Sequence, residues 1–389
     1  MKKKKNISTL IFIFITMLFV AVADNVKGVL VPAFKQSFSI TNSNIGDIFL
    51  IGSIGYVLFT YLGGILCEKI GQKRTYGLGF LIVVLSAFLF YVSSGYKMLL
   101  ICIFILNIGI ALICISINTL VPMLAIGFQA VAMNLTHFCY GVGSTLTQAG
   151  TGAFLSRGFN WRSIYIFIGV LFLLAFIIFL FIQIPEPNVD YKAVEKESKG
   201  NIKVALKNKM YYFYSIGLGF YVFAEVATAN WLVNFLQETY KFDYQKSTIY
   251  LSIFFILLTV GRLLGGFVAE KVGYFKTVII SLTIALILYT SSLMLGERGM
   301  FLICISGLFF AITFPTVVST IGNTFKENAI YMSGIIITTS STINMLLNKF
   351  IGNLSDVIGT EKAFYLIPIS LIISIAFLVL TYRNTKTLV

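Results

Sequence analysis

The chain has 389 residues, of which 58% are hydrophobic and only 11% are charged, and its formal net charge is +14. A soluble domain averages roughly 25% charged residues, so this composition excludes a water-soluble globular protein and predicts a protein that spans a membrane several times. The positive charge does not require a nucleic acid, because membrane proteins that face anionic lipid carry a basic bias.

The N-terminal segment admits two interpretations. Four lysines precede an apolar run that ends in Ala21-Val22-Ala23, which is the layout of a cleavable signal peptide. The alternative is a transmembrane helix that stays in the chain. The stretch "ADNVKGVLVPAF" at 23–34 aligns with "AEVATANWLVNF" at 224–235, deep inside the chain, where no signal peptidase acts. This internal repeat favours an uncleaved transmembrane helix.

Apolar runs long enough to cross a bilayer recur along the whole chain. A bilayer core requires about 20 apolar residues per helix, and the sequence predicts an all-α membrane protein with twelve such helices. Their expected ranges are 8–34, 44–66, 75–94, 98–126, 131–155, 162–184, 209–236, 247–269, 275–295, 299–323, 329–350 and 363–382.

One long polar connection divides these spans into two groups of six. We predict an N-terminal bundle over 1–184, a solvated linker over 185–208 and a C-terminal bundle over 209–389. With the N-terminus inside, 18 Lys and Arg residues fall on that side and nine on the other. Basic loops stay cytoplasmic, so both termini and the linker are expected to be cytoplasmic, in a cell membrane.

Residue chemistry gives no sign of an enzyme or a cofactor. The five cysteines have no C-x-x-C spacing and the chain has one histidine, so neither a disulfide framework nor a metal site is predicted. Motifs of hydrolases, zinc proteases and nucleotide-binding loops are absent from the sequence. We therefore expect no catalytic residues, no cofactor and, since nothing requires an oligomer, a monomer.

The two halves of the chain repeat each other. "GGILCEKIGQKRT" at 63–75 matches "GGFVAEKVGYFKT" at 265–277, and the alignment of 23–34 with 224–235 sets Asp24 opposite Glu225. Two six-helix units of the same orientation are parallel repeats, which is how major facilitator transporters are built. The pattern from Gly64 to Arg74 resembles the signature loop between helices 2 and 3 of that superfamily, and "NWR" at 160–162 is also typical of it.

Within the superfamily the chain resembles the fucose–galactose–glucose:proton symporter group. "YVFAEVATANWLVNFL" in the seventh span carries most of this likeness, and "NLTHFCYGVGS" and "FFAITFPTVVS" support it. Some members of the group have an acid in the fourth span, where this chain has Cys114, which weakens the assignment of a sugar. The resemblance implies the major facilitator fold and transport by alternating access.

The resemblance also implies a conformational latch at the cytoplasmic ends of helices. A glycine such as Gly64 lets a neighbouring helix approach closely. The alternative is ordinary solvated charge at helix ends, worth roughly 0–1 kcal/mol per pair. The latch residues are expected to be Gly64, Glu68, Lys69, Gly71, Arg74, Arg262 and Glu270, although Arg262 by its position fits structural pairing with a neighbouring helix.

Two acids within the spans are candidates for proton coupling. Charged groups in a bilayer are costly and usually face a cavity or a partner. Lys27 lies one helical turn from Asp24 and favours its ionised form, whereas Glu225 has no base nearby in sequence. We therefore predict Glu225 as the main proton carrier and Asp24 with Lys27 as a gating or substrate-contacting pair; a structural ion pair is the alternative for each.

Polar stripes on the fifth, tenth and eleventh spans predict a cavity for a small polar solute, which neutral amides and hydroxyls would bind. The alternative is hydrogen bonding between helices. The main hypothesis is a proton-coupled secondary transporter of a sugar, in contact with the lipid bilayer; a drug or metabolite exporter, a carrier of a small organic anion and a non-transporting receptor remain open. Candidate substrate-binding residues are Asn25, Lys27, Asn118, Asn134, His137, Gln148, Trp231 and Asn344.

Overall fold

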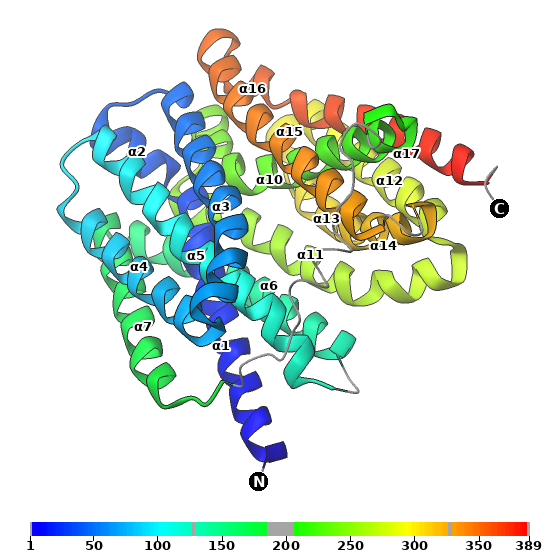
Figure 1. Ribbon diagram of the computed structural model, residues 1–389. Coiled ribbons are helices and arrows are strands. Elements are labelled where there is room, and N and C mark those ends of the chain that lie inside the picture. The colour runs from blue at the N-terminus through cyan, green and yellow to red at the C-terminus, as the bar shows by residue number, and fades with distance from the viewer. Residues whose placement is uncertain (1, 127–128, 185–205, 326–328, 387–389) are drawn as a thin grey trace. The chain divides into compact units, whose positions relative to one another are not determined.

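The computed structural model describes residues 2–126, 129–184, 206–325 and 329–386 (Figure 1). All regular secondary structure in these ranges is helical, as the sequence predicts. The predicted linker lies almost entirely outside the described residues, so its conformation stays a prediction.

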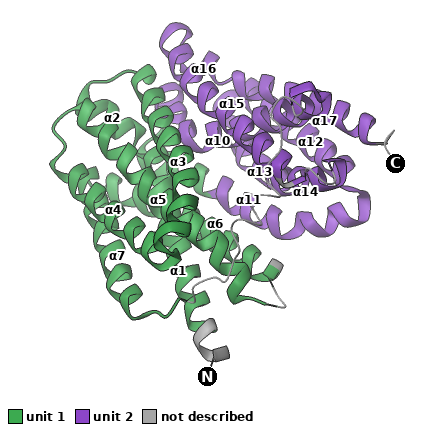
Figure 2. Ribbon diagram, viewed as in Figure 1, with its two compact units in different colours: residues 1–189, 242–252 green, residues 190–241, 253–389 purple. Residues whose placement is uncertain are grey.

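The chain forms two compact units (Figure 2). The first consists of residues 1–189 and 242–252, and the second of residues 190–241 and 253–389. The predicted bounds of the two bundles and the linker stay a prediction. Residues 242–252, which we expected in the C-terminal bundle, pack with the first unit: the Ser252 hydroxyl donates to the carbonyl of Thr145 at 3.0 Å.

In the first unit, each predicted span after the first corresponds to one long helix, and the first is divided near its end. The first span is continuous through Ala21 and Ala23, both fully buried, and breaks only at Leu30, just before Pro32. The helices are α1 (Lys2–Val29), α2 (Val31–Phe38), α3 (Asn42–Ile70), α4 (Gln72–Val92), α5 (Tyr96–Leu124), α6 (Gln129–Ser156) and α7 (Trp161–Phe181).

The second unit has the same order of long helices, with one interruption. The predicted span 299–323 is split at Ala311 and Ile312 into two helices, and Pro315 follows the split. Its elements are α10 (Lys209–Tyr240), α11 (Tyr244–Val272), α12 (Tyr274–Leu295), a 3₁₀ turn (Gly296–Gly299), α13 (Phe301–Phe310), α14 (Thr313–Phe325), α15 (Ala329–Ile358), α16 (Thr360–Ala363) and α17 (Leu366–Lys386).

Ten helical segments of the described chain are long and apolar enough to cross a membrane. The protein is thus a multi-pass membrane protein. The helices α6 and α15, which correspond to the fifth and eleventh predicted spans with their polar stripes, are 28 and 30 residues long.

The internal repeat is visible in the backbone at two pairs of turns. Gly71 between α3 and α4 has φ 87°, and Gly273 between α11 and α12 has φ 98°. Gly158 before α7 and Gly359 before α16 have φ 83° and 87°. Only glycine adopts this region at little cost. The repeat therefore preserves the geometry of the turns as well as the residue pattern.

The glycine pairs at the ends of α3 and α11 correct one prediction. A Cβ added to Gly63 would lie 2.9 Å from side-chain atoms of Leu112 and Ile115, and one added to Gly265 would lie within 3.0 Å of Ile312. A Cβ on Gly64 would meet nothing within 4 Å. The prediction that Gly64 allows close helix packing was therefore wrong, because the preceding glycine is the one that faces the neighbouring helix.

The close packing of α1 against α6 depends on Gly143. A Cβ at this position would lie 2.4 Å from the backbone oxygen of Leu18 and 2.9 Å from Cβ of Ala21. We expect Gly143→Ala to destabilise the protein by about 1–3 kcal/mol, since backbone atoms of α1 cannot move aside cheaply. The matched control is Gly150→Ala on the same helix, where a Cβ meets nothing within 4 Å. Thermal unfolding in detergent would check this; equal melting temperatures would contradict it.

Candidate functional site

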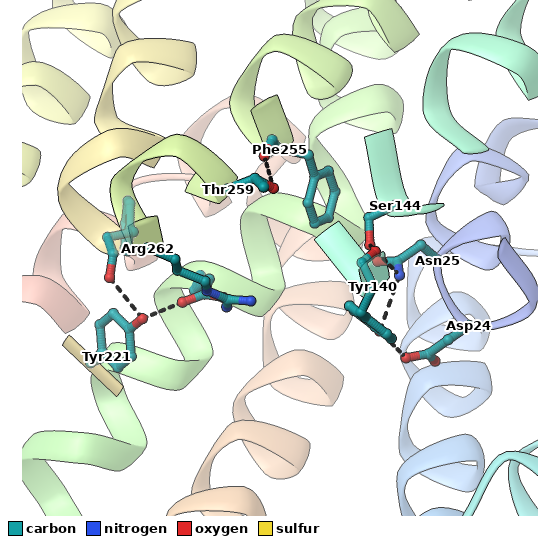
Figure 3. Close-up of polar contacts among 10 residues, drawn as sticks. Asp24, Asn25, Tyr140, Ser144, Tyr221, Phe255, Thr259 and Arg262 are labelled. Atoms are coloured by element: carbon teal, nitrogen blue, oxygen red, sulfur yellow. Dashed lines mark hydrogen bonds and ion pairs between the residues drawn. The ribbon is translucent and has the colours of Figure 1, made fainter. Parts of the chain in front are cut away.

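In the first unit, a polar cluster forms where α1 packs against α6 (Figure 3). The carboxylate of Asp24 accepts hydrogen bonds from Lys27 Nζ at 2.6 Å and from the Tyr140 hydroxyl at 2.7 Å. Asn25 Nδ2 donates to the hydroxyl oxygens of Tyr140 at 3.1 Å and Ser144 at 3.0 Å. Tyr140 and Ser144 are one helical turn apart, so α6 presents both to the same part of α1.

The hydroxyl of Tyr140 and the amide of Asn25 both have recorded acceptors when Asp24 is ionised. Tyr140 gives its single proton to Asp24 and accepts from Asn25, and Lys27 balances the negative charge. The Lys27 and Asp24 side chains are 16% and 29% exposed, so water is only partly excluded from the pair. The arrangement therefore suits a permanent ion pair next to neutral hydrogen-bonding groups.

One turn beyond Ser144, Gln148 has unused hydrogen-bonding capacity. Its side chain is 1% exposed, and neither Oε1 nor Nε2 has a hydrogen-bond partner among the described residues. A buried polar group left unpaired costs about 1–3 kcal/mol. An amide with one donor and one acceptor group available is what a hydroxylated solute could satisfy, so Gln148 is the best-supported member of the predicted binding set.

In the second unit, an acid is again held by a base and a tyrosine. Arg262 Nη2 on α11 lies 3.1 Å from Glu225 Oε1 on α10. The Tyr221 hydroxyl is hydrogen-bonded to Glu225 Oε2 and lies 2.9 Å from the carbonyl oxygen of Phe310, at the end of α13 (Figure 3). Glu225 thus has a basic partner that is distant in sequence, and Arg262 pairs with a neighbouring helix as its position suggested.

The amides of α15 form a separate network in the second unit. Asn348 Nδ2 donates to Asn344 Oδ1 at 2.7 Å, and Asn348 Oδ1 accepts from Asn230 and from the Trp231 indole at 3.2 and 3.3 Å. Trp231 is 1% exposed. In this conformation these groups hold α10 and α15 together, and the indole ring offers no open face for stacking.

Three other predicted binding residues are exposed: Asn118 on α5, and Asn134 and His137 on the first half of α6. Their role in binding stays a prediction that rests on the sequence.

The predicted latch residues Glu68, Lys69, Arg74 and Glu270 are exposed, and the structure records no hydrogen bond or ion pair of their side chains with other described residues. The neighbouring Lys73 of the signature loop donates to the carbonyl oxygen of Ile182 at 2.9 Å, beyond the last turn of α7. Arg162 of the "NWR" motif similarly donates to the carbonyl oxygen of Ser93 at 2.8 Å, beyond the end of α4. Basic groups of these two motifs therefore satisfy backbone carbonyls at helix ends.

Two tyrosines were missed in the sequence analysis. Tyr221 precedes Glu225 by four residues, so helical spacing alone could have placed it beside the acid. Nothing in the sequence singles out Tyr140 from the other 19 tyrosines, because its partner Asp24 is on another helix.

The pattern of the Major Facilitator Superfamily matches residues 13–339. The chain belongs to this superfamily. Relatives with sugars in their names share most of its length. A *Helicobacter pylori* protein named for glucose and galactose transport is 26% identical over 344 residues, covering 82% of each chain. The glucose/galactose transporter of *Brucella abortus* is 24% identical and covers 90% of this chain and 88% of its own length. The L-fucose-proton symporter of *Escherichia coli* is 22% identical, with 94% and 90% covered.

Solved structures of the superfamily confirm the fold. A bacterial homologue of the human lysosomal transporter Spinster superposes with a TM-score of 0.82 at 16% identity, with 97% of both chains covered. The transporter FucP gives a TM-score of 0.66 at 19% identity and covers 97% of this chain. The predicted all-α fold of twelve helices in two parallel repeats is thus confirmed, and the family is one of transporters rather than enzymes.

Proposed function

We propose that this protein is a proton-coupled secondary transporter that carries a small polar solute, a hexose or a related sugar, across a cell membrane by alternating access. The observation that carries the proposal is the pair of acid–base–tyrosine clusters on repeat-equivalent helices within the spans. Placing a carboxyl within a membrane span costs free energy, and such residues usually mark a substrate or ion pathway. A proton is the smallest ion that such a carboxyl can take up and release.

The assignment of a sugar is supported by neutral hydrogen-bonding groups near Asp24. Asn25, Tyr140, Ser144 and Gln148 lie on facing parts of α1 and α6, and Gln148 has both amide atoms unpaired among the described residues. Sugars are recognised by such amide and hydroxyl groups. The names of the *H. pylori*, *B. abortus* and *E. coli* relatives point to the same class of solute.

A small organic anion is the second candidate solute. Arg262 is 34% exposed in its pair with Glu225, so an anion could compete for the guanidinium when Glu225 is protonated. Relatives named as a hexuronate transporter of *Bacillus subtilis* and a nitrate transporter of *Staphylococcus epidermidis* are 22% and 26% identical. Charge balance separates the two candidates, since an anion taken up with one proton moves no net charge and a sugar with one proton moves one.

We further propose cytoplasmic termini and a latch at the cytoplasmic helix ends. The bias of Lys and Arg toward the N-terminal side supports the orientation, and the repetition of "EKIGQKRT" as "EKVGYFKT" supports a shared role for Glu68 and Glu270. The protein is proposed to act as a monomer in the bilayer.

Gln148 offers a test of the binding site that does not depend on transport. We expect Gln148→Leu to leave the melting temperature of the solute-free protein unchanged or raised, because it removes two unpaired buried groups. The same variant should lose stabilisation by solute, which for the native protein amounts to about 2.7 kcal/mol at 100 times Kd.

A panel of hexoses, 6-deoxyhexoses, hexuronates and nitrate, measured by thermal shift in detergent, would identify the solute. The control is Gln245→Leu, the same replacement at an exposed position of α11, which should respond to solute as the native protein does. Full solute stabilisation of Gln148→Leu would remove Gln148 from the site. Stabilisation by anions alone would replace the sugar assignment with the anion assignment.

A further inference from the structure

The Tyr221 hydroxyl has more acceptors than it has protons. It lies against Glu225 Oε2 and, at 2.9 Å, against the carbonyl oxygen of Phe310. A phenol has one proton to donate, together with lone pairs that accept. If Glu225 is ionised, both neighbours are pure acceptors and only one of them can receive the proton. If Glu225 is protonated, it can donate to Tyr221, and Tyr221 can donate to Phe310.

The Phe310 carbonyl lies at a weak point of the fold. The helix α13 ends at Phe310 and α14 begins at Thr313, although Ala311 between them keeps helical backbone angles of φ −52° and ψ −39°. The interruption is one of hydrogen bonding, since Pro315 lacks the N–H that would normally bond four residues back to Ala311. The Tyr221 hydroxyl of α10 contacts the tenth span at this interruption.

We propose that Tyr221 is a positioning residue that links protonation of Glu225 to the interruption between α13 and α14. With Glu225 protonated, Tyr221 donates to the Phe310 carbonyl and holds the interruption of the tenth span to α10. With Glu225 ionised, the hydroxyl turns to the carboxylate and the carbonyl loses its donor. A proton bound by Glu225 on α10 thereby changes the stiffness of the tenth span, which is formed by α13 and α14. The inference rests on the proposed role of Glu225 as proton carrier.

The charged surroundings are simple enough for Glu225 to act as the switch. On α10 and α11 the groups recorded against it are Tyr221 and Arg262. Arg262 bonds Oε1, so Oε2 can carry the proton while Oε1 keeps its hydrogen bond to the guanidinium, whose charge the neutral acid no longer balances. The hydrogen bonds recorded between α10 and the elements packed against it are to neutral groups: Tyr289 of α12 bonds Thr228, Thr320 and Thr324 of α14 bond Tyr214, Thr339, Ser340 and Asn348 of α15 bond Tyr211, Ser215 and Trp231, and Ser374 of α17 bonds Gly217. Charged groups are recorded at the far end of α10, where Thr360 of α16 bonds Glu238 and where Glu361 of α16 and Glu297 act on Tyr240.

The contrast with the first unit supports the assignment. Tyr140 also contacts an acid, but its other partner, Asn25, is a donor rather than an acceptor. Its proton therefore goes to Asp24 without competition. Only the cluster in the second unit has a hydrogen-bond pattern that must change with the protonation of its acid.

Hydrogen–deuterium exchange of the backbone amides of residues 311–314 and 316, expressed as protection relative to the intrinsic rate at each pH, tests this link. In the native protein we expect protection to fall on the order of fivefold between low and high pH, about the worth of one hydrogen bond. Glu225→Gln, whose amide can donate to Tyr221, should keep the low-pH protection at every pH. Tyr221→Phe should show the unprotected value throughout.

The control is Tyr214→Phe, which also removes a tyrosine hydroxyl between α10 and α14. The Tyr214 hydroxyl is bonded to Thr320 and Thr324, which do not titrate. The exchange of this variant at 311–314 and 316 should follow pH as in the native protein. Protection independent of pH in the native protein, or identical curves for native and Tyr221→Phe, would overturn the link. If Glu225→Gln still abolishes proton-driven uptake in that case, the proposed function stands without the link. If proton-driven uptake survives in Glu225→Gln, the proposed function fails at its proton carrier.

Discussion

Glu225→Gln is expected to abolish uptake driven by a pH gradient while exchange of solute across the membrane continues. A glutamine can contact both Arg262 and Tyr221 as Glu225 does, but it cannot release a proton. Transport steps that need no proton release therefore remain, and those that need it stop. We expect driven uptake to fall to the level of liposomes without protein.

Paired measurements in proteoliposomes check this expectation: uptake driven by an inward proton gradient, and counterflow of labelled solute at equal pH on both sides. Glu361→Gln, an acid-to-amide change at an exposed position of α16, is the control and should leave both rates unchanged. Loss of counterflow along with driven uptake would indicate that Glu225 binds solute or maintains the fold instead.

Asp24→Asn is expected to impair both stability and transport. The replacement removes the charge that balances Lys27, whose side chain is only 16% exposed. Breaking a fully buried ion pair costs about 3–5 kcal/mol, and partial exposure here reduces this to about 2–3 kcal/mol. We expect the melting temperature in detergent to fall on the order of 5 °C, and driven uptake to be lost.

The double variant Asp24→Asn/Lys27→Met separates the two effects. Removing the unbalanced cation should restore most of the melting temperature, because an apolar chain of similar length needs no partner. Driven uptake should stay low if the pair serves gating or solute binding. Recovery of uptake in the double variant would show that Asp24 and Lys27 have a structural role only.

The architecture could be predicted from the sequence because each of its signals is local or repeated. Apolar runs locate the helices, and the recurrence of "GG" with "EK" and of the turn glycines Gly71 and Gly273 reveals the two units. The interruption of the tenth span was missed, although Pro315 lies just beyond it, because an apolar run of that length predicts a continuous helix. The assignment of 242–252 was missed because periodicity gives no information on which bundle a helix end contacts.

The candidate site was only partly predictable. Asp24, Lys27 and Glu225 stand out because charge within a span is rare, and Asn25 lies next to the acid. The partners that define their chemistry come from other helices: Tyr140 for Asp24, and Arg262 with the Phe310 carbonyl for Glu225. Single-sequence reasoning cannot supply contacts of this kind. Trp231 shows the converse, since it was predicted to bind solute and the structure buries it against Asn348.

The measurement that tests the central claim most directly is proton entry driven by solute. The purified native protein in liposomes with a pH dye inside would be given hexoses, 6-deoxyhexoses and hexuronates in turn, without any imposed gradient. The proposal predicts that one sugar acidifies the lumen, and that the acidification is absent in Glu225→Gln. Solute entry with no change of internal pH for any compound, or acidification that is equal in Glu225→Gln, would contradict proton-coupled transport through this carboxyl.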